Sequence, residues 1–186
     1  CTEDRNAQVS EVWESIESDM DFLAVTGVED KLQDDVKKTI ETFRQAGIQV
    51  WMLTGDKVET ARCIAIATGM TKNDEEVFII TGDLGESLIK DKIRAYEGKN
   101  SLLIMVDGSA LTIIMSRPEL MRDFFKVTEH SKSVCVCRCS PSQKALVAKH
   151  IRILTGKRIA CVGDGGNDVP MILEADVGLG IVGKEG

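Results

Sequence analysis

Residues 158–168 read Arg-Ile-Ala-Cys-Val-Gly-Asp-Gly-Gly-Asn-Asp. The apolar stretch 158–162 predicts a buried strand, and the polar, glycine-rich turn after it precedes a short helical stretch. A second apolar stretch over 177–182 predicts another strand. Strand, polar turn and helix in this order form the repeating unit of a parallel sheet covered by helices.

The same alternation occurs earlier in the chain. Apolar residues at helical spacing predict a helix over 33–46, and 48–53 predicts a strand covered on both faces. A helix is expected after residue 56 and extends to about residue 68. Residues 134–138 predict a further strand, and a helix that extends to about residue 154 follows it. The sequence therefore predicts the α/β fold class, with a parallel sheet flanked by helices on both sides.

Two other regions show weaker patterns. The short apolar run 22–25 is interpreted as a strand. Residues 71–132 contain strand candidates at 77–80 and 102–106 and helix-like stretches near 88–96 and 118–129.

Composition excludes several classes of protein. The chain has 186 residues, of which 43% are hydrophobic and 28% charged, which excludes a disordered tail, a collagen-like chain and a coiled coil. The formal net charge of −7 makes nucleic acid a poor partner. The longest uninterrupted apolar run, 102–106, is too short to span a bilayer, and the polar start at 1–8 shows no signal peptide.

The cysteines are interpreted as reduced, structural thiols in a cytosolic protein, because a disulfide framework suits a short secreted chain. A metal site at the Cys-x-Cys-x-Cys run is the less favoured alternative. In an extended strand, all three of its side chains would point to one face, whereas tetrahedral sites gather ligands from different segments. The six cysteines are Cys1, Cys63, Cys135, Cys137, Cys139 and Cys161.

Thr54-Gly55-Asp56 directly follows a predicted strand and opens a helix. Ligands of open parallel sheets bind beyond the carboxyl ends of the strands, and a helix N-terminus offers free N–H groups to a phosphate. Thr54 adds a hydroxyl, and Gly55 allows close approach of the backbone. The alternative is that Thr54 or Asp56 only caps the helix.

Lys144 lies in the first turn of the helix that follows strand 134–138. The residues before it, 140–143, read Ser-Pro-Ser-Gln and form a capping box. Cations are disfavoured near a helix N-terminus, so a lysine there suits a neighbouring anion. Arg138, at the end of the strand, is a second candidate for anion binding. The alternatives are an exposed lysine and an edge-strand arginine.

The turn after strand 158–162 carries two carboxylates and an amide: Asp164, Asn167 and Asp168. Mg²⁺ favours carboxylate oxygens and keeps several waters, so one or two aspartates together with phosphate oxygens suffice. Asn167 can donate to a phosphate. The alternative is an Asp- and Asn-rich structural turn. Together with Thr54 and Lys144, this turn predicts a phosphate site with a Mg²⁺ position.

These motifs resemble the haloacid dehalogenase-like fold as found in P-type ATPases. The longer strings 26–33, 51–57 and 183–186, with Glu59-Thr60-Ala61, resemble the phospholipid-transporting branch, the lipid flippases. Residues 137–141, Cys-Arg-Cys-Ser-Pro, are most similar to the type II phospholipid-transporting subgroup. The resemblance is strong over 26–69 and 134–186, and weak before residue 20 and over 71–132.

The resemblance implies a reaction and a role for each matching residue. In the family, ATP phosphorylates an aspartate with Mg²⁺, and hydrolysis of the aspartyl phosphate drives phospholipid between leaflets. Asp164 would bind Mg²⁺ with Asp168 beside it. Asp56, Arg138 and Asp30 would face the nucleotide. The phosphoryl group would be held by Thr54, Gly55, Lys144 and Asn167.

The chain departs from the family at the nucleophile. In the family, the phosphorylated aspartate begins an Asp-Lys-Thr-Gly-Thr motif. Asp-Lys occurs here at 30–31, 56–57 and 91–92, but Thr-Gly-Thr follows none of them. We therefore expect the chain to be a piece of a larger protein. The resemblance implies that this is a membrane protein of the Golgi, endosomes or plasma membrane. The piece would contact the other cytosolic domains of that protein, and the phospholipid would be reached through its membrane domain. Residues 1–20 would end the nucleotide-binding domain or form a linker. Residues 21–186 would form the phosphorylation domain without its first motif. Alone, the piece is expected to be inactive.

Two other functions are alternatives to the transporter. A free-standing phosphatase of the same superfamily needs an Asp-x-Asp nucleophile after a strand, and Asp19-Met20-Asp21 has this form but precedes the predicted strand 22–25. A non-catalytic regulatory or docking module would keep the fold and lose the chemistry. Hydrolysis of p-nitrophenyl phosphate separates the first of these from the transporter.

Overall fold

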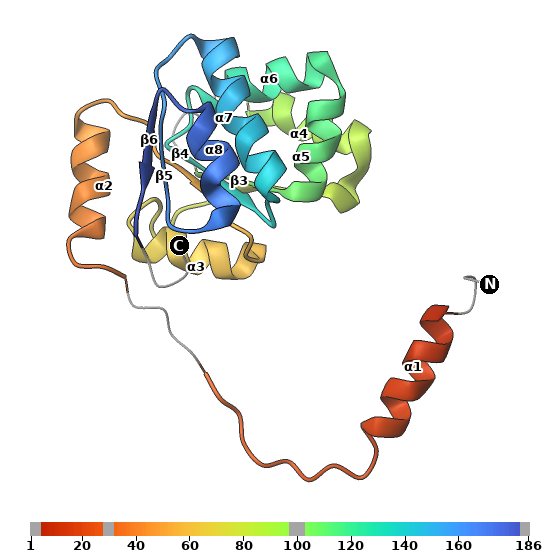
Figure 1. Ribbon diagram of the computed structural model, residues 1–186. Coiled ribbons are helices and arrows are strands. Elements are labelled where there is room, and N and C mark those ends of the chain that lie inside the picture. Colours follow the sequence, from red (N-terminus) through yellow and green to blue (C-terminus); the bar gives the residue numbers. More distant parts are fainter. Residues whose placement is uncertain (1–4, 28–31, 97–102, 183–186) are drawn as a thin grey trace. The chain divides into compact units, whose positions relative to one another are not determined.

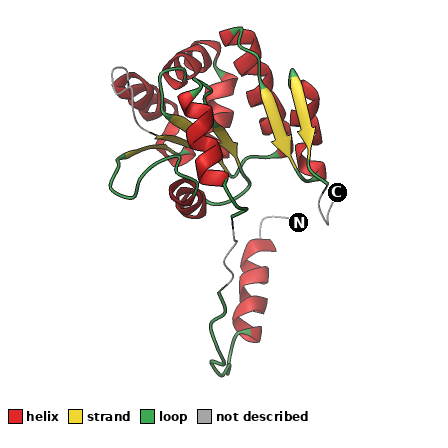
Figure 2. Cartoon of the chain, turned by 90° about the vertical axis from the view of Figure 1, so that its left-hand side faces the viewer, coloured by secondary structure: helices red, strands yellow, loops and turns green. Residues whose placement is uncertain are grey.

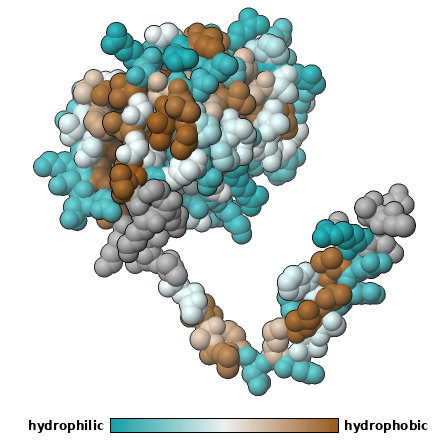
Figure 3. Space-filling model, in the orientation of Figure 1, coloured by the Kyte–Doolittle hydropathy of each residue, from teal (hydrophilic) through white to brown (hydrophobic). Residues whose placement is uncertain are grey.

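The computed structural model describes residues 5–27, 32–96 and 103–182, and it divides into two units, Cys1–Lys31 and Leu32–Gly186 (Figure 1). The first unit holds helix α1 (Arg5–Ile16) and an extended segment, and apolar side chains of both are exposed (Figure 3). The strand predicted over 22–25 is wrong. No described strand pairs with this segment, and Phe22 and Leu23 are 83% and 92% exposed.

The second unit is built on a four-stranded parallel sheet in the order β1-β4-β3-β2. Register is continuous across it, since Cys135 lies opposite both Met52 and Met105. The strands are β1 (Trp51–Leu53), β2 (Val77–Ile80), β3 (Leu103–Asp107) and β4 (Ser133–Cys137). The segment 71–132 therefore supplies two strands of this sheet, next to β4.

Strands β5 (Ala160–Gly163) and β6 (Val177–Gly180) form a separate two-stranded parallel sheet (Figure 2). The predicted strands exist, but the expected burial of β5 is wrong: Val162 is 53% exposed. The physical reason is that, among the described strands, β5 pairs only with β6, just as β1 pairs only with β4. Each of these two strands therefore has an edge that no described strand covers, and β1 is only half buried.

Helices cover both faces of the four-stranded sheet, as predicted. Alternate side chains of β3 enter the two cores, with Ile104 and Val106 in one and Leu103 and Met105 in the other. The first core is covered by α4 (Gly85–Tyr96), α5 (Gly108–Ser116), α6 (Pro118–Thr128) and α7 (Pro141–Thr155). The second is covered by α2 (Val36–Gln45) and α3 (Val58–Ala67).

Most predicted helix ends are confirmed. Gly47, Gly69 and Gly156 each follow a helix with a positive φ, the conformation that ends helices at glycine. Helix α5 was not predicted, because its sequence is apolar nearly all round and shows no amphipathic period. The helix expected directly after Thr54-Gly55-Asp56 begins later, at Val58.

The cysteine run only partly follows its predicted pattern. Cys135 and Cys137 lie on one face of β4 with their sulfurs 3.6 Å apart, but Cys139 belongs to the other core. The prediction of a common face is wrong for Cys139, because β4 ends at Cys137 and Arg138 turns the chain with φ 47°. Cys63, Cys135, Cys137, Cys139 and Cys161 are free thiols.

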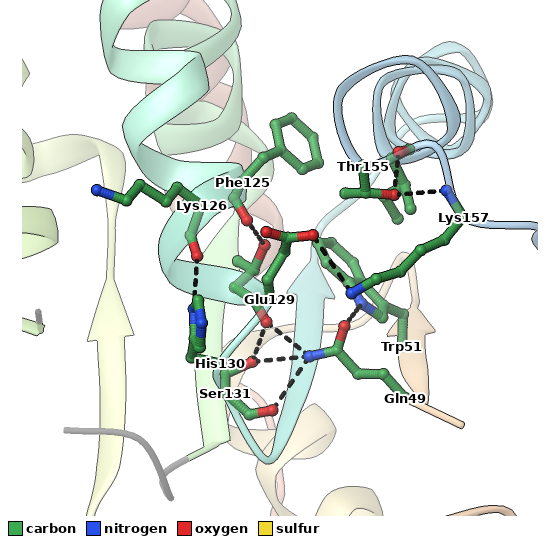
Figure 4. Close-up of polar contacts among 11 residues, drawn as sticks. Gln49, Trp51, Phe125, Lys126, Glu129, His130, Ser131, Thr155 and Lys157 are labelled. Atoms are coloured by element: carbon green, nitrogen blue, oxygen red, sulfur yellow. Dashed lines mark hydrogen bonds and ion pairs between the residues drawn. The ribbon is translucent and has the colours of Figure 1, made fainter. Parts of the chain in front are cut away.

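A polar cluster holds the amino ends of β1 and β4 (Figure 4). The Gln49 amide nitrogen donates to the carbonyl oxygens of Thr128 and Ser131, and its oxygen accepts from the indole of Trp51. Lys157, just before β5, pairs with Glu129 at 3.3 Å. This cluster joins the connections at the amino ends of the strands, opposite the predicted site.

A stability prediction follows from Glu75, which accepts from the Lys132 ammonium at 2.6 Å. This bond, aided by backbone and hydroxyl donors at Lys72 and Thr71, lowers the pKa of Glu75 from 4.5 to about 2. Because the folded pKa is depressed, the stabilisation is complete above pH 4.5 and is lost as the pH falls towards 2. The side chains of Lys132 and Glu75 are 25% and 30% exposed, so we expect the pair to contribute about 1–2 kcal/mol to the free energy of unfolding.

Urea unfolding at pH 6 and pH 3 checks this expectation. Glu75→Gln should flatten the pH dependence, whereas Glu86→Gln should not, because the pair that Glu86 forms with Arg117 is more than half exposed. An equal pH dependence in wild type and Glu75→Gln would contradict the assignment.

Candidate functional site

The carboxyl ends of β1 and β4 are joined by backbone hydrogen bonds. The Arg138 N–H donates to the Asp56 carbonyl oxygen at 2.8 Å, and the Cys139 N–H donates to that of Thr54 at 2.9 Å. The Thr54 hydroxyl donates to the Asp56 carboxylate at 2.8 Å and accepts from its N–H. Neither residue caps α3, whose N-cap is Lys57. The capping alternative is thus wrong, and the Thr54 hydroxyl lies at the strand end.

The predicted capping box starts helix α7 and is confirmed. The Ser140 hydroxyl accepts from the Gln143 N–H, and the Gln143 side-chain oxygen accepts from the Ser140 N–H. Lys144 follows in the first turn, and its ammonium binds an Asp168 carboxylate oxygen at 2.8 Å. The two side chains are 13% and 12% exposed. The lysine near this helix N-terminus thus has a neighbouring anion, and that anion is a carboxylate of the same chain.

Asp168 is held against the end of β5. A Cβ added at Gly163 would lie 2.3 Å from the Asp168 Cβ, so only glycine allows this close approach. The Asp168 N–H donates to the Gly165 carbonyl oxygen at 2.9 Å, which closes the turn. The glycines of this turn therefore place the carboxylate where Lys144 reaches it.

Asp164 and Asn167 lie in the same turn as Asp168 and are exposed. Within the described residues, the Asp164 carboxylate makes no hydrogen bond or ion pair, so its oxygens are available. An available carboxylate beside a second one suits Mg²⁺, which prefers oxygen ligands. No three His, Cys, Asp or Glu side chains of the described residues form a metal cluster by themselves. Phosphate, water or other ligands would have to complete the site.

The thiol of Cys139 is uncharged at neutral pH. Burial raises its pKa to about 11, although the Lys144 charge opposes that rise. Cys139 therefore does not compete with Asp168 as the anionic partner of Lys144.

The contacts thus link most of the predicted site residues in one continuous series. Backbone bonds connect Asp56 to Arg138 and Thr54 to Cys139. The chain continues through Ser140 to Lys144, and Lys144 binds Asp168, which lies in the same turn as Asp164. The predicted nucleotide-facing Asp30 lies outside the described residues. Asp19 and Asp21 of the phosphatase alternative follow α1, and no described strand precedes them. No described helix is long and apolar enough for a membrane span.

The turn between β3 and α5 was not predicted from the sequence. Asp107 caps α5 by accepting from the Ala110 N–H at 2.7 Å, and Gly108 packs against the loop between β4 and α7. The sequence Asp-Gly-Ser directly after an apolar strand is a possible signal, since Asp is a favoured N-cap and glycine permits close approach.

Comparison with known proteins agrees with this fold. A family model described as haloacid dehalogenase-like hydrolase matches residues 2–176. The phospholipid-transporting ATPase NEO1 of Saccharomyces cerevisiae is 47% identical over 183 residues, and the probable phospholipid-transporting ATPase IIB of Bos taurus is 43% identical over 185. Each match covers 98% of this chain and 16% of the relative.

The chain therefore spans only a small part of the length of these curated relatives, and the resemblance read from its motifs is confirmed over nearly its whole length. The parallel strands flanked by helices and the match over 2–176 lead to one conclusion. The chain belongs to the haloacid dehalogenase-like hydrolase family.

Proposed function

We propose that this chain is part of the phosphorylation domain of an ATP-driven phospholipid transporter. The observation that carries the proposal is the Lys144–Asp168 pair, held at 2.8 Å beside the carboxyl end of β5. A largely buried lysine, next to a carboxylate that lies in a glycine-rich turn, suits the binding of a phosphoryl group together with a cation. The names of the relatives support the choice of phospholipid as the transported substrate.

Each site residue has a role in this proposal. Phosphoryl transfer needs groups that position and neutralise the phosphate oxygens rather than covalent chemistry from them. Lys144 would supply positive charge, and the Thr54 hydroxyl would donate to a phosphate oxygen after leaving the Asp56 carboxylate. Gly55 and Asn167 would donate hydrogen bonds to the same group. Asp56, Arg138 and Asp30 would face the nucleotide. Mg²⁺, held by Asp164 with Asp168 beside it, would neutralise developing charge.

The edges of β1 and β5 that no described strand covers support a further part of the proposal. We infer that a strand from outside this sequence lies between them and carries the aspartyl nucleophile. A strand there would pair on both sides and would join the two sheets into one. If it ran parallel to its neighbours, its carboxyl end would lie among Thr54, Lys144 and Asp164, where a nucleophile is needed. The exposed Val162 would then be covered.

The proposed function also implies a cellular location and binding partners for this chain. The chain would be a cytosolic part of an integral membrane protein of the Golgi, endosomes or plasma membrane, would bind ATP, and would contact the other cytosolic domains of its own protein. The phospholipid would bind in the membrane domain. This chain alone would not hydrolyse ATP, because the nucleophile would lie elsewhere.

Phosphorylation of the full-length protein by γ-labelled ATP tests the proposal. We expect Mg²⁺-dependent label that hydroxylamine releases, as an acyl phosphate requires, on an aspartate outside residues 1–186. Reconstituted in vesicles, the protein should move a fluorescent phospholipid between leaflets only with ATP. No label would contradict the ATPase assignment, and ATP-dependent label without lipid movement would contradict the choice of substrate.

A further inference from the structure

The Gln143 side chain makes contacts that the capping box does not require. Its amide nitrogen donates to the carbonyl oxygen of Gly108 at 2.7 Å and to the hydroxyl of Thr112 at 3.0 Å. The Thr112 hydroxyl donates to the same Gly108 oxygen at 2.9 Å. These three residues, here called the Gln143 bridge, connect the start of α7 to the start of α5. The bridge thus connects the helix that carries Lys144 to segment 71–132, which contains Gly108 and Thr112.

The two turns that the bridge joins are in direct contact. A Cβ added at Gly108 would lie 2.3 Å from the Arg138 carbonyl oxygen and 3.0 Å from the Gln143 side-chain oxygen. The turn at Gly108 is itself fixed, because the Asp107 carboxylate accepts from the N–H groups of Ala110 and Gly82. The loop between β4 and α7 therefore lies against a turn with little freedom to move.

This loop and the first turn of α7 that follows it carry the cations of the candidate site. Arg138 adopts a left-handed conformation with φ 47°, and Lys144 directly follows Gln143. On one side, the loop is bonded to the carbonyl oxygens of Thr54 and Asp56; on the other, the Gln143 bridge holds it. The position of the Lys144 ammonium relative to Asp168 thus depends on both neighbours of the loop.

We propose that Gln143 is a positioning residue, which through Gly108 and Thr112 fixes the first turn of α7 and thereby places Lys144 against Asp168. The proposal rests on the proposed function for its effect on catalysis, but the geometry it asserts is independent of any activity. It gives segment 71–132 a role in the site: β3 and α5 support the first turn of α7, which carries Lys144. A displacement of a catalytic group by about 1 Å can cost up to about 100-fold in rate.

Two substitutions separate the bridge from the cap. Gln143→Glu keeps an oxygen that accepts from the Ser140 N–H, but it brings a carboxylate to the Gly108 oxygen at a position where the amide donated. Ser140→Ala removes the cap hydroxyl and leaves the donors of Gln143 intact. A role limited to helix capping predicts that Ser140→Ala is at least as harmful as Gln143→Glu. The Gln143 bridge predicts the opposite order.

The rate of phosphoenzyme turnover at saturating ATP and the KM for ATP are measured in the full-length protein. Gln143→Glu should lower the rate about 10-fold with a KM changed less than about twofold, and Ser140→Ala should change the rate less than about twofold. Thr112→Val, which keeps the side-chain shape, should give an intermediate loss. Equal rates for Gln143→Glu and wild type, or an equal loss in Ser140→Ala, would overturn the proposal.

A second measurement does not depend on catalysis. In protein labelled at lysine nitrogen and aspartate carboxyl carbon, NMR signals of Lys144 and Asp168 should shift in Gln143→Glu and stay close to wild type in Ser140→Ala. Unchanged signals in Gln143→Glu would overturn the positioning role. If wild type forms no phosphoenzyme while these signals shift as expected, the proposed function fails and the role of the bridge stands.

Discussion

Lys144→Ala in the full-length protein is expected to slow aspartyl-phosphate turnover about 100-fold or more. Lys144 is largely buried, and its ammonium lies at the carboxyl ends of the strands, where phosphate oxygens would gather. Donors preorganised in such sites stabilise developing charge far more than they would in water. Quench-flow measurement of phosphoenzyme formation and decay gives the effect directly.

The same substitution also leaves Asp168 without its cation, so loss of folding must be separated from loss of catalysis. Breaking a buried pair by removing one partner costs about 3–5 kcal/mol when the remaining charge stays buried. Thermal unfolding of the variant shows how much of this cost applies. Lys149→Ala, an exposed lysine on the same helix, is the matched control and should retain the wild-type rate. A wild-type rate in Lys144→Ala would refute the role assigned to Lys144.

Local rules predicted much of the structure. The capping box at 140–143 and the glycines after α2, α3 and α7 depend on neighbouring residues alone, and each lies where the sequence places it. The strands of segment 71–132 were also predicted, because a short apolar run such as 77–80 between polar residues is typical of a buried strand. The fold class followed from the order of these elements.

Non-local features could not be predicted in the same way. Which strands pair with β1 and β5 is set by tertiary structure, and apolar composition alone made β5 look buried. The Lys144–Asp168 pair joins residues 24 apart, and the Gln143–Gly108 bond joins residues 35 apart. Lys144 and Asp168 were each predicted as site residues and Gln143 as a capping residue, but the contacts between Lys144 and Asp168 and between Gln143 and Gly108 are set by tertiary packing.

The second large effect is expected for Asp164→Asn, which should abolish Mg²⁺-dependent phosphorylation of the full-length protein. Asp164 is exposed at the end of β5 and makes no ion pair within the described residues, so its charge is not consumed by a structural partner. An amide of the same shape keeps an oxygen but loses the negative charge that a hard divalent cation prefers. The substitution should therefore remove cation affinity without disturbing packing.

Label incorporation from γ-labelled ATP over a range of Mg²⁺ concentrations checks this expectation. Asp91→Asn, an exposed carboxylate on α4, is the control and should follow the wild-type curve. Thermal stability of Asp164→Asn should match wild type, because no described hydrogen bond is lost, whereas a structural Asp-rich turn would unfold more readily. Asp164 lies between Gly163 and Asp168 in the turn after β5. If the variant is as stable as wild type but is not phosphorylated, the loss of phosphorylation is due to the lost negative charge in this turn. Normal phosphoenzyme levels in Asp164→Asn would remove Asp164 from the metal site and leave Asp168 as the remaining carboxylate of the turn.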